Sequence, residues 1–295
     1  MQDSVSYQSV PGRTRLPGTP TPMHLWDAGN GMRLAGDSWG DPRDPLVILL
    51  HGVGQTRNAW TRTAQLLAQS GYHAVTFDAR GHGDSDWARE GSYSREAMVQ
   101  DLQRLVKIFG KTPSLVGASM GGITSMLAIG TGKIQASALI LVDIAPRTEQ
   151  AGVGRVFGFM RDTAGGFASL EDAAAAIERY RPRPQKARNL SGLAKNLRKG
   201  SDGKFYWHWD PRLLTRERGS EEQRVKAARN LQLPTLLVRG GQSDVVSEES
   251  AQEFLEICPH AEYVSINGAS HMVSGDRNDV FGEAALAFLS RTKSL

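Results

Sequence analysis

The sequence predicts an α/β fold, in which helices cover both faces of a mostly parallel sheet. Short continuous apolar runs, such as residues 46–50 and 138–142, have the pattern of strands that are buried on both faces. Segments with apolar residues at helical spacing lie between these runs, and such alternation is typical of parallel strands joined by helices. With 295 residues and 40% hydrophobic content, the chain can form one large domain or a domain with an insertion.

The expected strands follow from these runs and from the turns that bound them. Residues 23–40 alternate enough to form two edge strands, with Gly29-Asn30-Gly31 as the tight turn between them. The remaining strands are expected at 46–50, 73–77, 115–116, 138–142, 235–238 and 263–266.

Capping residues indicate where the helices begin and end. Gly71 closes a helix over 58–70, because glycine adopts the left-handed conformation that ends many helices. Ser94 opens a helix over 94–109, with Glu96 in the first turn, where a negative charge is favoured. Further helices are expected after Gly122, over 248–257 and over 278–289.

The strand–helix rhythm breaks between Ile144 and about Glu217. Helical patterns occur at 170–180 and 187–197, but no comparable apolar strand is visible. We therefore expect residues 146–218 to form a helical cap inserted into an α/β core of residues 23–145 and 219–295. Residues 1–22 contain four prolines and two glycines with little apolar periodicity, and we expect them to form a flexible N-terminal tail without the apolar stretch of a secretory signal.

Charge is distributed unevenly along the chain, whose net charge is +4. The expected cap holds 15 Lys and Arg against 8 Asp and Glu. A basic segment could attract anionic substrates, lipid surfaces or nucleic acid, but a solvated, arginine-rich helical surface is the simpler interpretation, and no nucleic-acid motif accompanies it. No apolar run approaches the length of a membrane span, and the single cysteine, Cys258, excludes an internal disulfide. A cytoplasmic location is expected, with oligomeric state undetermined.

Ser119 is the candidate nucleophile. It follows the apolar residues Leu115 and Val116, and Gly121 and Gly122 open the helical segment after it. A sharp strand–turn–helix connection needs strained backbone angles and close approach of neighbouring elements, which favours glycine on both sides of the serine. Such a turn exposes the Ser119 oxygen to a base and places the amino end of a helix beneath it.

A Gly-x-Ser-x-Gly string is weak evidence by itself, and the chain supplies its own control. Gly36-Asp37-Ser38-Trp39-Gly40 fits the same pattern. It is followed by Asp41-Pro42 and by Pro45, which break helices rather than start them. We therefore interpret Ser38 as part of a turn.

Serine is a weak nucleophile at neutral pH unless a base removes its proton. His271 is the best candidate, because it lies in a loop just after the last expected strand, and reactive groups gather at the carboxyl ends of parallel strands. Simpler structural roles are expected for the other histidines, which are His24, His51, His73, His82, His208 and His260.

A carboxylate should hold the His271 imidazole in the correct tautomer. Asp244 follows the strand at 235–238, and its rival Asp143 ends the strand at 138–142. Either could reach His271 from a neighbouring strand end. We favour Asp244, on its loop position and on the chain order Ser, Asp, His.

Hydrogen-bond donors must stabilise the oxyanion of an acyl-transfer intermediate. One donor should be the backbone N–H of Met120, the residue after the nucleophile. The other should be the backbone N–H of Val53, in the turn after the strand at 46–50. Gly52 and Gly54 flank Val53 and let this backbone approach a substrate closely.

These residues together resemble the α/β-hydrolase superfamily, in its esterase, cofactor-free haloperoxidase and epoxide-hydrolase-like branch. The resemblance rests on His51-Gly52-Val53-Gly54, residues 78–85, Gly117-Ala118-Ser119-Met120-Gly121-Gly122, Asp244 and His271. It covers the chain from about residue 30 to the end and implies the α/β-hydrolase fold. Epoxide hydrolases and haloalkane dehalogenases of this branch use an aspartate as nucleophile, so the serine favours acyl transfer to water instead.

The expected function is hydrolysis of carboxylic esters or lactones by a Ser-His-Asp triad through an acyl-enzyme, without cofactor or metal. The same residues could cleave a carbon–carbon bond in a diketone, hydrolyse an amide or make peracids, since fold does not fix function. A ligand-sensing protein that retains the triad is the alternative from another class. A dinucleotide-binding oxidoreductase is set aside, because the turn after residues 46–50 lacks the third glycine of the phosphate-binding fingerprint.

Overall fold

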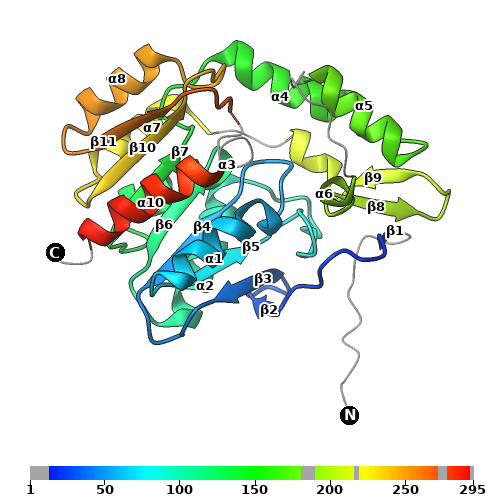
Figure 1. The fold of residues 1–295 in the computed structure, drawn as a ribbon, viewed down its shortest axis with the longest axis horizontal. Coiled ribbons are helices and arrows are strands. Elements are labelled where there is room, and N and C mark those ends of the chain that lie inside the picture. The colour runs from blue at the N-terminus through cyan, green and yellow to red at the C-terminus, as the bar shows by residue number, and fades with distance from the viewer. Residues whose placement is uncertain (1–12, 181–189, 216–218, 272–277, 293–295) are drawn as a thin grey trace.

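A central eight-stranded sheet organises the structure, a computed structural model that describes residues 13–180, 190–215, 219–271 and 278–292 (Figure 1). The strand order is β11-β10-β7-β6-β4-β5-β3-β2, and all neighbours from β11 to β5 are parallel. This confirms the predicted α/β fold with a mostly parallel sheet. The strands are β2 (His24–Asp27), β3 (Arg33–Trp39), β4 (Leu46–Leu50), β5 (His73–Phe77), β6 (Ser114–Ala118), β7 (Ala138–Val142), β10 (Thr235–Gly240) and β11 (Glu262–Ile266).

The antiparallel strands β2 and β3 form the predicted hairpin at one edge of the sheet. β3 pairs with β5, and β2 pairs with β3. The turn between them uses Gly29, Asn30 and Gly31, whose φ angles are 75°, 55° and 70°. These left-handed conformations suit glycine and asparagine and let the chain reverse over three residues.

Helices cover both faces of the sheet. Alternate residues of β4 enter two separate cores: Leu46, Ile48 and Leu50 face one, whereas Val47 and Leu49 face the other. Helices α1 (Thr61–Gln69) and α10 (Asn278–Thr292) pack together on the Val47 face. Helices α2 (Arg95–Phe109), α3 (Met120–Gly130), α7 (Glu221–Arg229) and α8 (Glu248–Ile257) cover the opposite face.

Helix ends follow the predicted capping residues. The Ser94 side chain accepts a hydrogen bond from the Ala97 N–H at 3.2 Å, and α2 ends at Gly110 in the left-handed conformation. The helix predicted over 58–70 begins with a 3₁₀ turn, η1 (Arg57–Trp60), before α1.

At the end of α8, burial raises the pKa of the Cys258 thiol to about 11, which makes it a packing residue rather than a nucleophile.

Residues 146–218, the expected helical cap and called the cap below, contain a small sheet as well as helices. Helix α5 lies where predicted, but the segment predicted as a helix over 187–197 holds only the short α6 among its described residues before a strand begins at Leu197. This strand, β8, forms a hairpin with β9, and the two strands are only four and three residues long. Strands so short give no continuous apolar run in the sequence. The elements are α4 (Gln150–Asp162), α5 (Leu170–Tyr180), α6 (Ser191–Ala194), β8 (Leu197–Gly200), β9 (Phe205–Trp207) and η2 (Pro211–Thr215).

The start of the chain joins the cap. β1 (Arg13–Arg15) pairs antiparallel with β8 and completes a three-stranded sheet (Figure 1). The Leu16 side chain, which follows β1, is buried. The expected flexible tail is therefore wrong for residues 13–22, whereas residues 1–12 lie outside the described part. The pairing is supported by charged side chains: the Arg13 guanidinium lies 3.9 Å from the centre of the Tyr206 ring. Such contacts leave no hydrophobic pattern in the sequence.

None of the helices in the described ranges combines the length and the apolar character that crossing a bilayer requires.

Candidate active site

Ser119 occupies a strained turn between β6 and α3. Its backbone angles φ and ψ are 46° and −111°, a combination that residues other than glycine rarely adopt. Helix α3 begins at the next residue. A Cβ on Gly117 would lie 2.6 Å from the Gly122 nitrogen, and a Cβ on Gly121 would lie 2.5 Å from the Leu50 carbonyl oxygen. The predicted strand–turn–helix is thus confirmed, and its glycines are needed because backbone approaches backbone on both sides of the serine.

His271 follows β11 and makes a hydrogen bond with a buried carboxylate. Its Nδ1 lies 2.7 Å from Oδ2 of Asp143, a residue with no solvent exposure at the end of β7. The sheet order places β10 between β7 and β11, so the loop after β11 crosses the end of β10 to reach Asp143. Gly240 permits this crossing, because a Cβ there would lie 2.3 Å from the Ser270 carbonyl oxygen.

The Asp143 carboxylate receives two further hydrogen bonds. Oδ1 accepts from the Gly240 N–H at 2.7 Å, and Oδ2 accepts from the Ser243 hydroxyl at 2.5 Å. An ionised carboxylate is a pure acceptor, so the arrangement assigns the His271 proton to Nδ1 and leaves Nε2 as the basic nitrogen. Asp143 also has a left-handed backbone, with φ of 48°. Strain at both Ser119 and Asp143 is typical of residues that the surrounding fold holds for function.

The contact predicted for Asp244 is made by Asp143 instead, so that prediction is wrong. The Asp244 side chain is 43% exposed, and its Oδ2 lies 2.7 Å from Nη2 of Arg155 on α4. Asp244 lies four residues after the end of β10, in the turn that leads away from the end of the strand. Asp143, like Ser119, is the first residue after its strand. That immediate strand-end position is the sequence signal that would have selected it.

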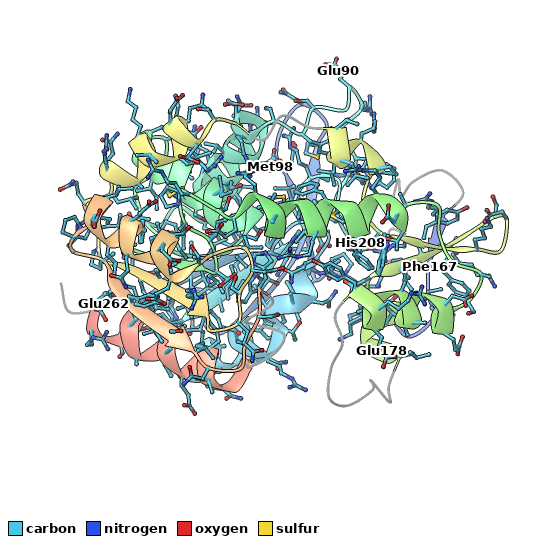
Figure 2. All side chains as sticks on the ribbon, turned by 90° about the horizontal axis from the view of Figure 1, so that it is seen from above. Glu90, Met98, Phe167, Glu178, His208 and Glu262 are labelled. Atoms are coloured by element: carbon cyan, nitrogen blue, oxygen red, sulfur yellow. The ribbon has the colours of Figure 1, made fainter. Side chains whose placement is uncertain are left out.

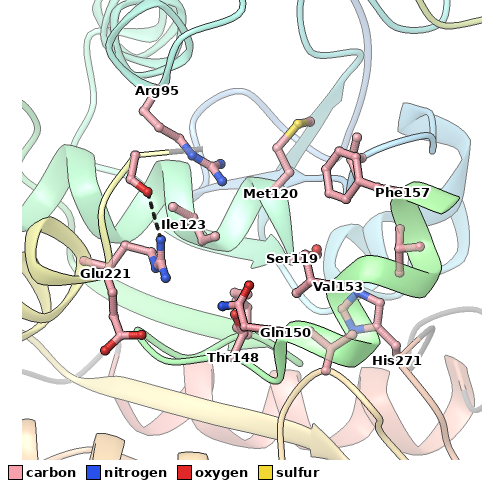
Figure 3. Close-up of a pocket in the computed structure, with 16 residues that line it drawn as sticks. Arg95, Ser119, Met120, Ile123, Thr148, Gln150, Val153, Phe157, Glu221 and His271 are labelled. Atoms are coloured by element: carbon pink, nitrogen blue, oxygen red, sulfur yellow. Dashed lines mark hydrogen bonds between the residues drawn. The ribbon is translucent and has the colours of Figure 1, made fainter. Parts of the chain in front are cut away.

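Ser119 and His271 line the same pocket, as Figure 3 shows. No hydrogen bond joins these two described side chains in the present geometry. Catalytic hydrogen bonds are often long in the absence of substrate and tighten when it binds.

The pocket has a volume of about 230 Å³ and two chemically different ends. Met120, Val153 and Phe157 lie on one side of the pocket with Ser119, whereas Arg95 and Glu221 lie at the other end, near the beginning of α7 (Figure 3). The polar side chains of Thr148 and Gln150 lie between these ends, close to Ser119. The apolar lining includes Val53, Met120, Ile123, Val153, Val156 and Phe157, and the polar lining includes Arg95, Thr148, Gln150, Glu221 and Arg224.

The turn of residues 52–54 lies beside Ser119. A Cβ on Gly52 would come within 3.4 Å of the Ser119 Cβ, and Val53 lines the pocket. Among the described residues, no acceptor binds the Val53 N–H. Met120 is the first residue of α3, at the helix end that favours negative charge. Both residues predicted to form an oxyanion hole therefore border the nucleophile.

In the described part of the chain, no group of three or more His, Cys, Asp or Glu side chains is arranged to hold a metal ion.

Comparison with known proteins identifies the family. Residues 45–277 match the family model described as the alpha/beta hydrolase fold. The chain is 30% identical over 265 residues to the sn-1-specific diacylglycerol lipase ABHD11 of Mus musculus, with 85% of this chain and 83% of the relative covered. It is 27% identical over 258 residues to the 3-hydroxybutyrate-oligomer hydrolase of Cupriavidus necator, with 81% and 87% covered.

Solved structures agree on the fold. The M. tuberculosis esterase Rv0045c superposes with a TM-score of 0.73 at 23% identity, covering 92% of this chain and 93% of that one. Other relatives are an epoxide hydrolase of Xenopus tropicalis, 37% identical over only 95 residues, and a non-heme chloroperoxidase of Kitasatospora aureofaciens, 25% identical over 298 residues. Both names belong to the branch that the sequence motifs resemble. On this evidence, the chain belongs to the α/β-hydrolase family.

Proposed function

We propose that this protein is a serine hydrolase that cleaves carboxylic esters, including lactones, through an acyl-enzyme intermediate. One observation carries the proposal: His271, paired with the buried carboxylate of Asp143 at 2.7 Å, borders the pocket where Ser119 stands on its strained turn. A nucleophile, a base and a residue that orients the base define acyl transfer in this fold.

In the proposed mechanism, Ser119 attacks the ester carbonyl while His271 Nε2 accepts the hydroxyl proton. Asp143, in the role first expected of Asp244, fixes the imidazole tautomer and stabilises the imidazolium. The N–H groups of Val53 and Met120 stabilise the oxyanion. His271 then returns the proton to the leaving alcohol, and water activated by the same imidazole releases the acid from Ser119.

The named activities of the relatives support an ester substrate. Diacylglycerol lipase and 3-hydroxybutyrate-oligomer hydrolase are both names of enzymes that cleave carboxylic esters. A pocket of about 230 Å³ with an apolar wall suits a small molecule rather than a polymer segment.

Covalent labelling tests the nucleophile and its activation together. An organophosphonate should modify the wild-type protein at Ser119, as located by peptide mass, and Ser119→Ala should abolish both labelling and hydrolysis of a p-nitrophenyl ester. Ser38→Ala is the matched control, because Ser38 has the same flanking glycines but lies within β3, not in the turn first expected, and bonds His24 Nε2 at 2.8 Å. Retained turnover in Ser119→Ala would refute the assignment. Lactones and diketones tested beside esters separate ester hydrolysis from carbon–carbon cleavage.

A further inference from the structure

Three buried histidines surround the 52–54 turn. His51, His82 and His208 each have an exposed fraction of 1% or less. The ring centres of His51 and His82 are 5.0 Å apart, and those of His82 and His208 are 5.9 Å apart. None of them lines the pocket with Ser119, so the proposed mechanism does not use them directly.

His51 and His82 hold the peptide groups on both sides of Val53, and His208 holds the following group, between Gly54 and Gln55. His51 Nδ1 lies 2.8 Å from the Gly52 carbonyl oxygen, which belongs to the same peptide group as the Val53 N–H. The Gly54 N–H, on the next peptide group, donates to His82 Nε2 at 3.2 Å. His208 Nε2 lies 3.2 Å from the Gly54 carbonyl oxygen. Because a peptide group is planar, holding the Gly52 carbonyl fixes the direction of the Val53 N–H. Holding the Gly54 carbonyl fixes the Gln55 N–H, which donates to that same Gly52 carbonyl at 3.2 Å.

Each ring also accepts a backbone N–H, which fixes its tautomer. His51 Nε2 accepts from Ala79 at 2.9 Å, and His208 Nδ1 accepts from Gly83 at 2.7 Å. An imidazole that accepts at one nitrogen and donates at the other must be neutral. Burial lowers the pKa of both His51 and His208, which favours this neutral state.

His208 differs from the other two because it comes from the cap. It follows β9, and Figure 2 shows it where the cap meets the core. Its neighbour Asp210 docks on the same core loop, since the Asp210 N–H donates to the Gly81 carbonyl at 2.9 Å and Oδ2 accepts from Tyr93 at 2.5 Å. The cap is thereby joined to the turn that carries Val53.

We propose that His208 is a positioning residue through which the cap orients the Val53 N–H toward the oxyanion. The proposal rests on the proposed esterase function. Without the bond from His208, the Gly54 carbonyl loses a buried partner, and the 52–54 turn gains freedom to turn its N–H groups away from the pocket. This freedom should weaken the stabilisation of the transition state, in which the oxyanion forms, rather than the binding of substrate.

Two variants separate this role from packing. In His208→Gln the amide nitrogen can still donate to Gly54, whereas in His208→Asn the shorter side chain can only accept from Gly83. We expect His208→Asn to lower kcat by roughly tenfold or more with little change in KM, somewhat less than the loss of an oxyanion donor itself. His208→Gln should recover much of that loss, and the rate of organophosphonate labelling at Ser119 should follow kcat in both variants. His260→Gln is the control, since His260 Nε2 also lies 3.0 Å from a backbone carbonyl, that of Leu233, but on an exposed loop.

The outcomes are distinguishable. If the wild type hydrolyses no ester, the proposed function fails and this inference falls with it. If the wild type is active and both His208 variants keep its kcat, the positioning role alone is overturned. Equal losses of kcat in both variants that parallel their losses in urea stability would show a packing role and also overturn it.

A separate observation concerns the polar end of the pocket. Arg224 lines it with an exposed fraction of 8%. Its Nε donates to the Pro146 carbonyl at 2.7 Å and its Nη1 to the Gly219 carbonyl at 3.4 Å, the two points where the cap leaves and rejoins the core. Among the described residues, Nη2 makes no hydrogen bond and no carboxylate lies within 4 Å of the guanidinium. Burial lowers the pKa of this group.

The charges around Arg224 favour an anionic ligand. Arg95, which is also largely buried, lines the same pocket. The lining carboxylate of Glu221 is bound by Arg147, whose Nε lies 2.9 Å from Oε1. A buried guanidinium is stabilised by an opposite charge, and its planar fork fits a carboxylate. We infer that the substrate is an ester that bears a carboxylate, which Arg224 binds through Nη2; this too rests on the proposed function.

Matched ester pairs test this inference. In the first pair, p-nitrophenyl hydrogen glutarate carries a carboxylate in its acyl part, and p-nitrophenyl valerate is its neutral partner. In the second pair, 4-acetoxybenzoate carries the carboxylate in its alcohol part, and 4-methylphenyl acetate is its neutral partner. We expect at least one anionic ester to have a kcat/KM roughly tenfold or more above that of its neutral partner, as one charge-assisted contact allows.

Arg224→Met should lower kcat/KM far more for the anionic ester than for its neutral partner and so remove the preference, whereas Arg224→Lys should retain part of it. No preference in either pair would overturn the inference. A loss that falls equally on charged and neutral esters would do the same, because it would show that Arg224 acts only on the cap junction. Absence of all hydrolysis would instead contradict the proposed function.

Discussion

Asp143 and His271 are 128 residues apart in the chain, yet the carboxylate oxygen of one lies 2.7 Å from Nδ1 of the other. The pair exists because the ends of β7 and β11 meet at the same edge of a parallel sheet. Asp143 is fully buried and is held by Gly240 and Ser243 in addition to His271. A carboxylate so constrained can orient the imidazole without moving.

Asp143→Asn should leave the fold intact and lower kcat by about 10³–10⁴, because an amide that donates to Nδ1 stabilises the wrong imidazole tautomer. Asp244→Asn should change kcat by less than about twofold, since Asp244 forms a surface pair with Arg155. Steady-state hydrolysis of a p-nitrophenyl ester measures both. A comparable loss in Asp244→Asn would restore Asp244 as the residue that orients His271.

Gly122→Ala should destabilise the protein by about 1–3 kcal/mol, since the new methyl would lie 2.4 Å from Ile144 Cγ2 and 2.7 Å from the Gly117 oxygen. Urea unfolding measures the change. Gly154→Ala is the control: it lies within α4 with no atom within 4 Å of the new Cβ, so it should stabilise by about 0.5–1 kcal/mol. A neutral effect at Gly122 would show that the turn relaxes freely.

Arg57→Leu should cost roughly 3–5 kcal/mol of stability, because it leaves buried carboxylates without their counter-charge. The Arg57 side chain is 1% exposed and lies 2.6 Å from Asp78, 2.8 Å from Asp37 and 2.9 Å from Asp84. Arg43→Leu provides the control, since Arg43, whose side chain is 90% exposed, pairs with Asp41 at the surface. Equal stability of the two variants would contradict a structural role for the Arg57 cluster.

Stability should fall as the pH drops below about 6.5, the ordinary pKa of histidine. Burial lowers the pKa of His51 and His208, so the unfolded chain binds more protons than the folded one in this range. Each such group then contributes a slope of up to about 1.4 kcal/mol per pH unit. The charges that act on these rings are Asp78 and Arg57 near His51, and Arg198 and Arg57 near His208.

Urea unfolding at pH 7.5 and pH 5.5 measures this loss. His208→Gln should reduce the pH dependence, because the amide does not titrate. Asp78 does not obscure the result, since Arg57 helps to keep its pKa below the ordinary value and outside this pH window. A slope that is the same in His208→Gln as in the wild type would contradict the assignment.

The sheet, its helices and the Ser119 turn could be predicted because each leaves a local pattern. Apolar runs mark buried strands, and the glycines around Ser119 mark close backbone contacts. The choice between Asp143 and Asp244 could not be made in the same way, since it depends on which strand end the loop after β11 crosses. β1 was missed for a related reason: it is held by its ladder to β8, by the contact of Arg13 with the Tyr206 ring and by the pairing of Arg15 with Asp84 of the core, all between residues far apart in the chain.

The antiparallel pairing of β1 with β8, in which Arg13 lies opposite Gly200, has a consequence for how the chain folds during its synthesis. On the ribosome, β1 is synthesised before the parallel sheet, whereas the strand that it must join is synthesised only after most of that sheet. Closing so long a loop is slow, so we expect β1 to pair with β8 only after the rest of the fold has formed. Refolding followed by hydrogen exchange would then show protection at Thr14 appearing after protection in β4 and β6.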